Sequence, residues 1–168
     1  MILVRLALAA LVLPAARPGQ APVPAYRGFA AGAPYREFAE RARALARRDT
    51  LRCNTSRKTA RLMECGVQVR DPVDSVAFYL SAYVLDGKIA MVAFTDSGGP
   101  RLVERTKRDV ARRFGAAQRA QNGMWEWKHG RRLVRYNWRG RGDVRWISIT
   151  LTDLDVMDGI HRFASGSR

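Results

Sequence analysis

Apolar residues recur with the period of an amphipathic helix in two segments of the chain. The first segment runs from Pro34 to Arg47 and has apolar residues at positions i, i+4, i+7 and i+8. The second opens with the loop 96–100, and its apolar stripe continues to Phe114, just before Gly115. Proline suits the first turn of a helix and glycine suits its C-terminal end. We therefore predict a helix in each segment.

The segments that follow each helix are rich in β-branched and aromatic residues, which is typical of strands. One hairpin is predicted around the polar turn 55–59, and a second around Asp86-Gly87, which is a strong turn signal. Three more strands follow the second helix, and apolar and polar residues alternate in the last of them. The predicted strands are 50–54, 62–69, 76–84, 88–95, 124–128, 132–138 and 144–152.

The order of these elements is helix then strands, and then helix then strands again. This order predicts an α+β fold with two helices and an antiparallel sheet rather than a βαβ parallel sheet. We expect a single domain over residues 31–153, or two tandem helix-plus-strands half-modules over 31–95 and 96–153. Residues 22–30 are expected to be an extended lead-in, and residues 154–168 a C-terminal turn with a loose tail.

The first 21 residues have the pattern of a secretory signal peptide. A positively charged head ends at Arg5, an unbroken apolar run covers 6–13, and small residues stand three and one positions before a cut after Ala21. The apolar run is far shorter than the roughly 20 residues that a bilayer-spanning helix needs. We therefore favour cleavage over a membrane anchor, expect no transmembrane anchor in the mature chain, and place it in the periplasm or outside the cell.

Export changes the interpretation of the two cysteines, because a cysteine pair outside the cytoplasm persists as a disulfide. In an antiparallel hairpin centred on Thr59, Cys53 faces Cys65, and facing residues have Cα separations within the disulfide range. The alternative is two free thiols at a reactive site, but the pair lacks CxxC spacing. We therefore predict a disulfide between Cys53 and Cys65.

The order and spacing of these features resemble those of exported helix-plus-antiparallel-sheet modules. The features are a Gly-opened helix over 32–47, a segment with Cys53 and Cys65, and a second helix that ends at 113–115 before a Trp-rich sheet. Such modules include the small outer-membrane-assembly lipoproteins and the tandem-module β-lactamase inhibitor proteins. The likeness covers most of the mature chain, and it implies a binding role rather than a catalytic one.

The sequence offers few candidates for catalysis or metal binding. His129 and His161 are far apart, and the chain has no GxSxG element and no Walker-type or GxGxxG phosphate loop. Asp153, Asp155 and Asp158 carry oxygens that calcium prefers, but their spacing lacks the EF-hand positions. We therefore predict no catalytic residues, no metal and no cofactor, and we expect a protein that is not an enzyme.

Composition adds a basic character to this picture. The 168 residues include 30 Lys+Arg against 15 Asp+Glu, a formal net charge of +15, and Arg and Trp concentrate in the last third. A basic sheet with aromatic side chains can bind a polyanion, because charge attracts the polyanion and rings stack on it. Genomic bias toward Arg and ordinary core packing of Trp are the alternative explanations. The candidate polyanion-binding residues are Arg132, Arg135, Arg139, Arg141, Arg145, Trp138 and Trp146.

Two hypotheses of function follow. The first is an exported, non-enzymatic binding or structural module of the cell envelope, whose partner is an envelope protein of unknown identity. The alternative is a basic protein that binds a polyanion through the Arg- and Trp-rich C-terminal sheet. Acidic polysaccharide, anionic lipid and extracellular nucleic acid are the polyanions considered, and nucleic acid is the least expected of the three.

Overall fold

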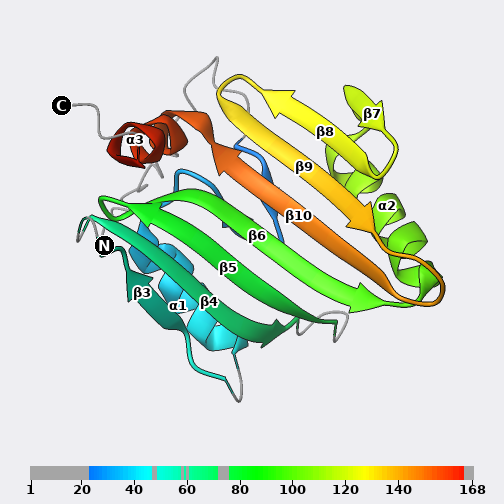
Figure 1. Cartoon of the computed structure of the whole chain (residues 1–168), viewed down its shortest axis with the longest axis horizontal. Helices are drawn as coiled ribbons and strands as arrows, with labels where there is room; N and C mark the ends of the chain where they lie inside the picture. Colours follow the sequence, from blue (N-terminus) through cyan, green and yellow to red (C-terminus); the bar gives the residue numbers. More distant parts are fainter. Residues whose placement is uncertain (1–22, 47–48, 58, 60, 72–75, 165–168) are drawn as a thin grey trace, which may run out of the picture.

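The structure is a computed structural model, which describes residues 23–46, 49–57, 59, 61–71 and 76–164. The predicted signal peptide and the end of the predicted tail lie outside the described residues. The main element is an eight-stranded antiparallel sheet with the strand order β3-β4-β5-β6-β10-β9-β8-β7 (Figure 1). The predicted α+β fold with an antiparallel sheet is confirmed. Residues 154–164 form a third helix, however, where we predicted only a C-terminal turn.

Two helix-plus-meander units share this sheet. In the first, helix α1 (Tyr35–Leu45) is followed by β3 (Arg52–Thr55), β4 (Leu62–Arg70), β5 (Ala77–Leu85) and β6 (Lys88–Gly98). In the second, helix α2 (Pro100–Phe114) is followed by β7 (Arg119–Gln121), β8 (Met124–His129), β9 (Arg132–Arg139) and β10 (Arg145–Asp153). The units meet where β6 pairs antiparallel with β10, from Gly98 opposite Arg145 to Met91 opposite Thr152.

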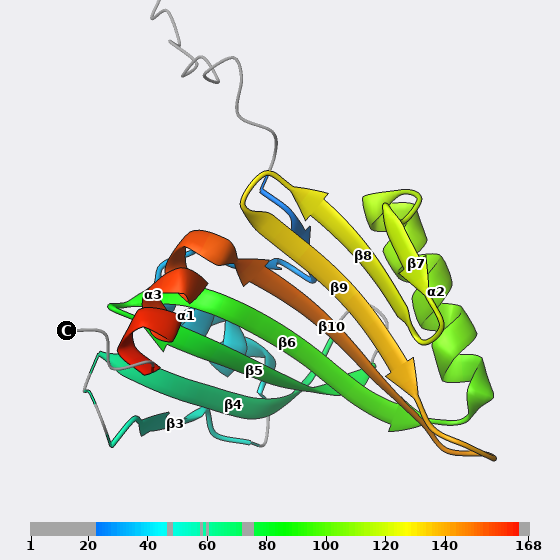
Figure 2. The same cartoon turned by 45° about the horizontal axis from the view of Figure 1, so that its top comes forward.

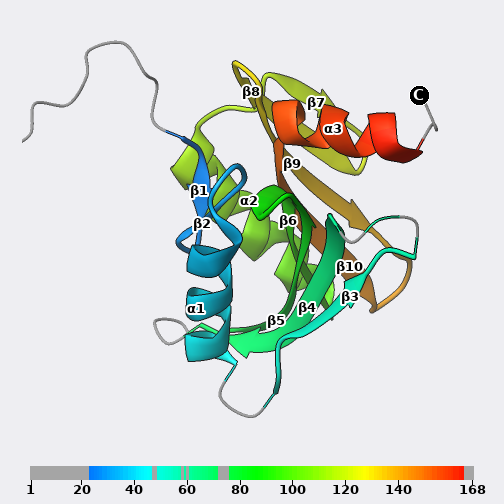
Figure 3. The ribbon, with the colours of Figure 1, turned by 90° about the vertical axis from the view of Figure 1, so that its left-hand side faces the viewer.

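The described helices lie on both faces of the sheet. Helices α1 and α2 pack on one face, whereas α3 (Leu154–Ala164) lies on the opposite side, at one end of the sheet (Figures 2 and 3). A Cβ at Gly159 of α3 would come within 2.6 Å of Leu85 at the end of β5, so the glycine permits close packing there. No other described element covers the face that carries α3.

The buried residues of α2 lie on the stripe that the sequence predicts. Helix α2 buries Leu102, Val103, Thr106 and Val110 against the sheet. Two buried aromatic side chains of the second meander donate hydrogen bonds to this region: Tyr136 Oη to the Val103 carbonyl (3.2 Å) and Trp127 Nε1 to the Gly115 carbonyl (3.1 Å). These bonds satisfy polar groups that burial would otherwise penalise.

The prediction of an extended lead-in over 22–30 is wrong for the described part of that segment. Residues Ala25–Tyr26 (β1) and Phe29–Ala30 (β2) form a two-stranded hairpin. Arg27 and Gly28 both have positive φ (49° and 80°), as the tightest hairpin turns require. Tyr26 and Phe29 are buried, so the segment contributes to the core instead of leading into it.

Tyr26 joins two aromatic clusters of the core. Its ring centroid lies 5.0 Å from that of Phe94 in the first unit and 6.4 Å from that of Phe114 in the second. Its hydroxyl donates a 2.6 Å hydrogen bond to Asp109 Oδ2 on α2. Burial, followed by the bond to Asp109, raises the pKa of Tyr26, so the phenol keeps the proton that it donates.

Both outer strands of the sheet are short and exposed. β3 has 4 residues and β7 has 3, and all of them are exposed. Because β3 is shorter than β4, it leaves part of the β4 edge unpaired. Asp49 Oδ2 accepts a 2.8 Å hydrogen bond from the Gln68 amide on that edge, and this bond is the main cause of the lowered pKa of Asp49.

The predicted disulfide is confirmed. Cys53 on β3 and Cys65 on β4 are directly opposite each other, and their sulfurs are bonded. Cys65 is buried in the core, whereas Cys53 lies on the exposed outer strand. The bond therefore attaches a strand with no buried residue of its own to the core.

We predict that the disulfide supplies a measurable share of the free energy of unfolding. Loop closure over 12 residues of sequence separation corresponds to a stabilisation of about 3 kcal/mol, because it limits the unfolded chain. We expect the double variant Cys53→Ala, Cys65→Ala to lose this amount in urea unfolding. Reductant should lower the free energy of unfolding of the wild type to that of the double variant, and it should leave the value of the double variant unchanged. A loss below about 1 kcal/mol would contradict the prediction.

Candidate binding surfaces

The seven candidate Arg and Trp residues of the C-terminal sheet do not form one surface. Side chains alternate along β9 and β10, so Arg132, Trp138 and Arg145 point to the side of α1 and α2. Arg135, Arg139 and Trp146 point to the opposite side, and Arg141 lies in the loop between the two strands.

Most of the tryptophans belong to the core. Trp138 is half-buried, its ring stacks on Tyr136 with centroids 5.1 Å apart, and it lies 5.9 Å from Trp125. The ammonium of Lys107 on α2 lies 4.6 Å from the Trp138 ring centroid, within cation–π range. Among the described tryptophans only Trp146 is exposed, at 52%. Core packing therefore accounts for Trp138, and Trp146 remains as a surface candidate.

Several of the candidate arginines already have partners within the protein. Arg135 donates from Nε (3.0 Å) and Nη2 (2.7 Å) to Glu126 Oε2 on the neighbouring strand β8. Arg145 donates from Nη1 to the carbonyls of Gly142 (2.6 Å) and Val144 (3.1 Å). Arg139 and Arg141 are exposed and have no ion pair within the described residues. The candidate arginines therefore differ both in where they lie and in whether they have a partner within the protein.

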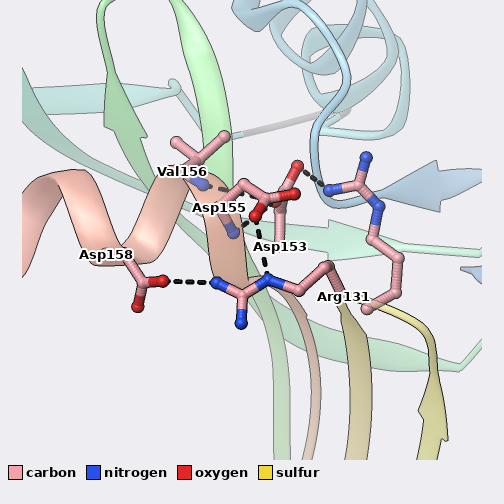
Figure 4. Close-up of polar contacts among 6 residues, drawn as sticks. Arg131, Asp153, Asp155, Val156 and Asp158 are labelled. Carbon is pink, nitrogen blue, oxygen red and sulfur yellow. Dashed lines mark hydrogen bonds and ion pairs between the residues drawn. The ribbon is translucent and has the colours of Figure 1, made fainter.

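The acidic residues at the end of β10 form a structural junction with two arginines (Figure 4). Asp153 is buried, forms an ion pair with Arg132, and accepts the amide hydrogens of Asp155 (2.9 Å) and Val156 (3.2 Å) at the start of α3. Arg131 pairs with Asp155 (2.8 Å) and with Asp158. All three carboxylates are therefore neutralised by arginine, and Asp153 also caps the N-terminus of α3. No group of three or more His, Cys, Asp or Glu that could hold a metal occurs among the described residues.

A different surface emerges on the face that carries α3. Away from α3, the side chains of this face come from β5, β6, β10 and their neighbours, and we call this area the uncovered face. Its cross-strand register places Tyr79 beside Thr95, Thr95 beside Ser148, and Ser148 beside Asn137. The central side chains of the uncovered face are Tyr79, Ser81, Ala93, Thr95, Ser97, Asn137, Trp146, Ser148 and Thr150.

The centre of the uncovered face has no charged side chain. The three central strands β5, β6 and β10 place only aromatic, hydroxyl and apolar residues there. Charged residues lie on the flanking strands, such as Glu64 on β4 and Arg139 on β9. Burial, followed by the Glu64 charge, raises the pKa of Tyr83 at one end of this face, which keeps its phenol protonated.

The two exposed aromatic residues of the uncovered face are positioned by the sheet. Tyr79 is 47% exposed, and a Cβ at Gly66 would come within 1.9 Å of its hydroxyl oxygen. The absence of a side chain at Gly66 therefore lets the Tyr79 ring lie across β4. Trp146 stands between Ser97 on β6 and Arg139 on β9. Because Tyr79 and Trp146 come from strands separated only by β6, they belong to one surface.

Helix α2 carries a row of arginines that lies outside the predicted polyanion-binding set. Arg101, Arg105, Arg108 and Arg112 are spaced i, i+4, i+7 and i+11 and are all exposed, so they follow one side of the helix over about 16 Å. We call them the α2 arginine row. Arg101, Arg105 and Arg108 form no ion pair within the described residues, whereas Arg112 pairs with Asp109 (3.5 Å).

The spacing of the α2 arginine row is visible in the sequence. Glu104 is four residues before Arg108, and Asp109 is four residues before Arg113. This spacing suggests that the two acidic residues of α2 neutralise these arginines. In the structure they pair at i, i+3 instead, Glu104 with Lys107 (3.0 Å) and Asp109 with Arg112. Arg108 therefore keeps an uncompensated charge.

Comparison of the chain with protein-family models, with curated protein sequences and with solved structures gives no match. The resemblance to exported helix-plus-sheet modules stays an expectation from the sequence. None of the helices in the described part of the chain is long and apolar enough to cross a membrane.

We predict that substitution of Asp153, which pairs with Arg132 and caps α3, causes a large loss of stability. Asp153→Ala leaves Arg132 half-buried without its carboxylate and removes the cap of α3, so we expect the free energy of unfolding to fall by about 3 kcal/mol. Asp158→Ala removes an exposed pair and should cost less than about 1 kcal/mol. Urea unfolding of both variants tests this, and equal losses would contradict the assignment of Asp153 as the central residue.

Proposed function

We propose that the protein is an exported, non-enzymatic binding module of the cell envelope that holds a protein partner on its uncovered face. The composition of that face carries the proposal. Two exposed aromatic residues stand in a centre without charged side chains, and charged residues surround this centre. Protein interfaces have the same arrangement, with aromatic residues and few charges in the core and a polar rim.

Two features support the exported location in this proposal. The disulfide between Cys53 and Cys65 is of the kind that persists in oxidising compartments. The pattern of the first 21 residues is that of a cleaved signal peptide. An envelope or secreted protein is therefore the expected partner. The arginines at the rim, such as Arg139, favour a partner with acidic residues around its contact site.

Site-specific crosslinking tests the proposal. We expect a photo-crosslinking amino acid in place of Ser97, which lies beside Trp146 on the uncovered face, to capture one envelope protein in living cells. The same amino acid in place of Glu40, which is exposed on α1, should not capture it. The combined changes Tyr79→Ala and Trp146→Ala should abolish capture from position 97, because truncated aromatic residues at an interface core weaken binding by about 30-fold or more each.

A control separates this effect from general loss of apolar surface. Val23 is also exposed but lies outside the uncovered face, so Val23→Ala should leave capture unchanged. Equal capture from positions 97 and 40, or capture that survives the two aromatic substitutions, would contradict the proposal.

Polyanion binding is a second candidate function, and the α2 arginine row favours it over the C-terminal sheet. Three neighbouring arginines on one helix side lack ion pairs within the described residues, whereas the sheet arginines are divided between two faces. A straight row of positive charges can contact successive anionic groups of a linear polyanion such as an acidic polysaccharide. Each phosphate, sulfate or carboxylate that an arginine neutralises also releases counterions, which favours binding.

Chromatography on immobilised heparin at increasing salt tests this second function and its location. The triple variant Arg101→Gln, Arg105→Gln, Arg108→Gln should elute at much lower salt and reduce the salt dependence of log K by about two to three units. The matched triple variant Arg135→Gln, Arg139→Gln, Arg141→Gln removes the same charge and should shift elution less. If the second variant shows the larger shift, the C-terminal sheet is the binding site instead.

A further inference from the structure

A cavity of about 150 Å³ lies on the covered side of the sheet, between α2 and the strands β5, β6 and β10. Its apolar lining includes Phe78 and Phe94 from the first unit and Ile147 and Ile149 from β10. All four side chains are at most slightly exposed. A cavity of this volume has room for a single benzene-sized ring.

Charged side chains line the same cavity, and most of them are compensated. Asp109 accepts the Tyr26 hydroxyl (2.6 Å) and pairs with Arg112 (3.5 Å). Arg27 pairs with Asp71. Asp96 Oδ1 accepts the backbone amide of Ser97 (2.7 Å). The acidic groups around the cavity are thus engaged by hydrogen-bond donors or by arginine.

Arg105 is the exception among these groups. It lines the cavity from α2 and is exposed, and it forms no hydrogen bond or ion pair within the described part of the chain. Its charge acts on Asp96 at a distance, but burial outweighs this effect and raises the pKa of Asp96. An exposed guanidinium beside the apolar part of a cavity offers a planar pair of donors to a carboxylate.

We propose that this cavity binds a small aromatic carboxylate with a single ring. The ring packs among Phe78, Phe94 and the two isoleucines of β10, and the carboxylate binds the Arg105 guanidinium. A carboxylate is favoured over a cation because the chain has a formal net charge of +15, which attracts anions to the whole surface. The volume of about 150 Å³ favours a single ring over fused two-ring ligands. The site lies on the side of the sheet opposite the uncovered face, so it is independent of the proposed protein partner.

Titration of the full mature protein with benzoate tests the proposal, with amide chemical shifts and calorimetry as readouts. Benzoate should bind and shift the amides of β6, β10 and α2 around the cavity. Benzamide, which has the same shape without the charge, should bind at least about tenfold more weakly, and so should benzoate to Arg105→Gln. The matched variant Arg108→Gln removes a charge from the same helix outside the cavity lining and should leave the benzoate affinity within about twofold.

A second variant tests the position of the ring. Ile147→Phe adds volume at the edge of the cavity and should abolish the binding of both benzoate and benzamide, while an unchanged amide spectrum away from the cavity reports that the variant is folded. The proposal is overturned if benzoate shifts no amide around the cavity, if 2-naphthoate binds as well as benzoate, or if Arg105→Gln and Arg108→Gln weaken benzoate equally.

Discussion

The antiparallel pairing of β6 with β10 is the contact on which the rest of the structure depends. These strands end two separate meanders, and eight residue pairs from Met91–Thr152 to Gly98–Arg145 join them. Without this pairing each meander would have a long, unpaired edge strand that carries several buried residues, which is unfavourable in water. The pairing also brings α1 and α2 onto the same face, where Tyr26 links the aromatic clusters of the two units.

The two faces of this joined sheet have separate roles because side chains alternate along every strand. One face supplies the core, together with a small cavity bordered by Arg105. The other face keeps Tyr79 and Trp146 exposed over a floor of small hydroxyl residues. A shift of one residue in the β6–β10 register would exchange these sets, so the uncovered face and the core are specified by the same pairing.

The fold class, helices α1 and α2 and the disulfide were predictable because their signals are local. Helical period and turn residues are visible within short segments, and counting from the 55–59 turn places Cys53 opposite Cys65. Strands β1, β2 and β7 have only two or three residues, too few to show a period. The candidate binding surfaces were harder to predict, since the partner of an arginine depends on strand register. Arg135 meets Glu126 across β8 and β9, and Arg132 meets Asp153 across β9 and β10.

The short outer strands and the Asp49 carboxylate restrict how copies of this chain can associate. A long strand with free amides is a template for polymerisation by sheet extension. Here the Cys53–Cys65 disulfide holds β3 against β4. The Gln68 amide on the β4 edge, beyond the end of β3, donates its hydrogen bond to Asp49. Since the pKa of Asp49 is lowered, that protection persists into mildly acidic surroundings. Fibril-like stacking through this edge is therefore disfavoured, even when the protein is concentrated in a confined, acidified compartment.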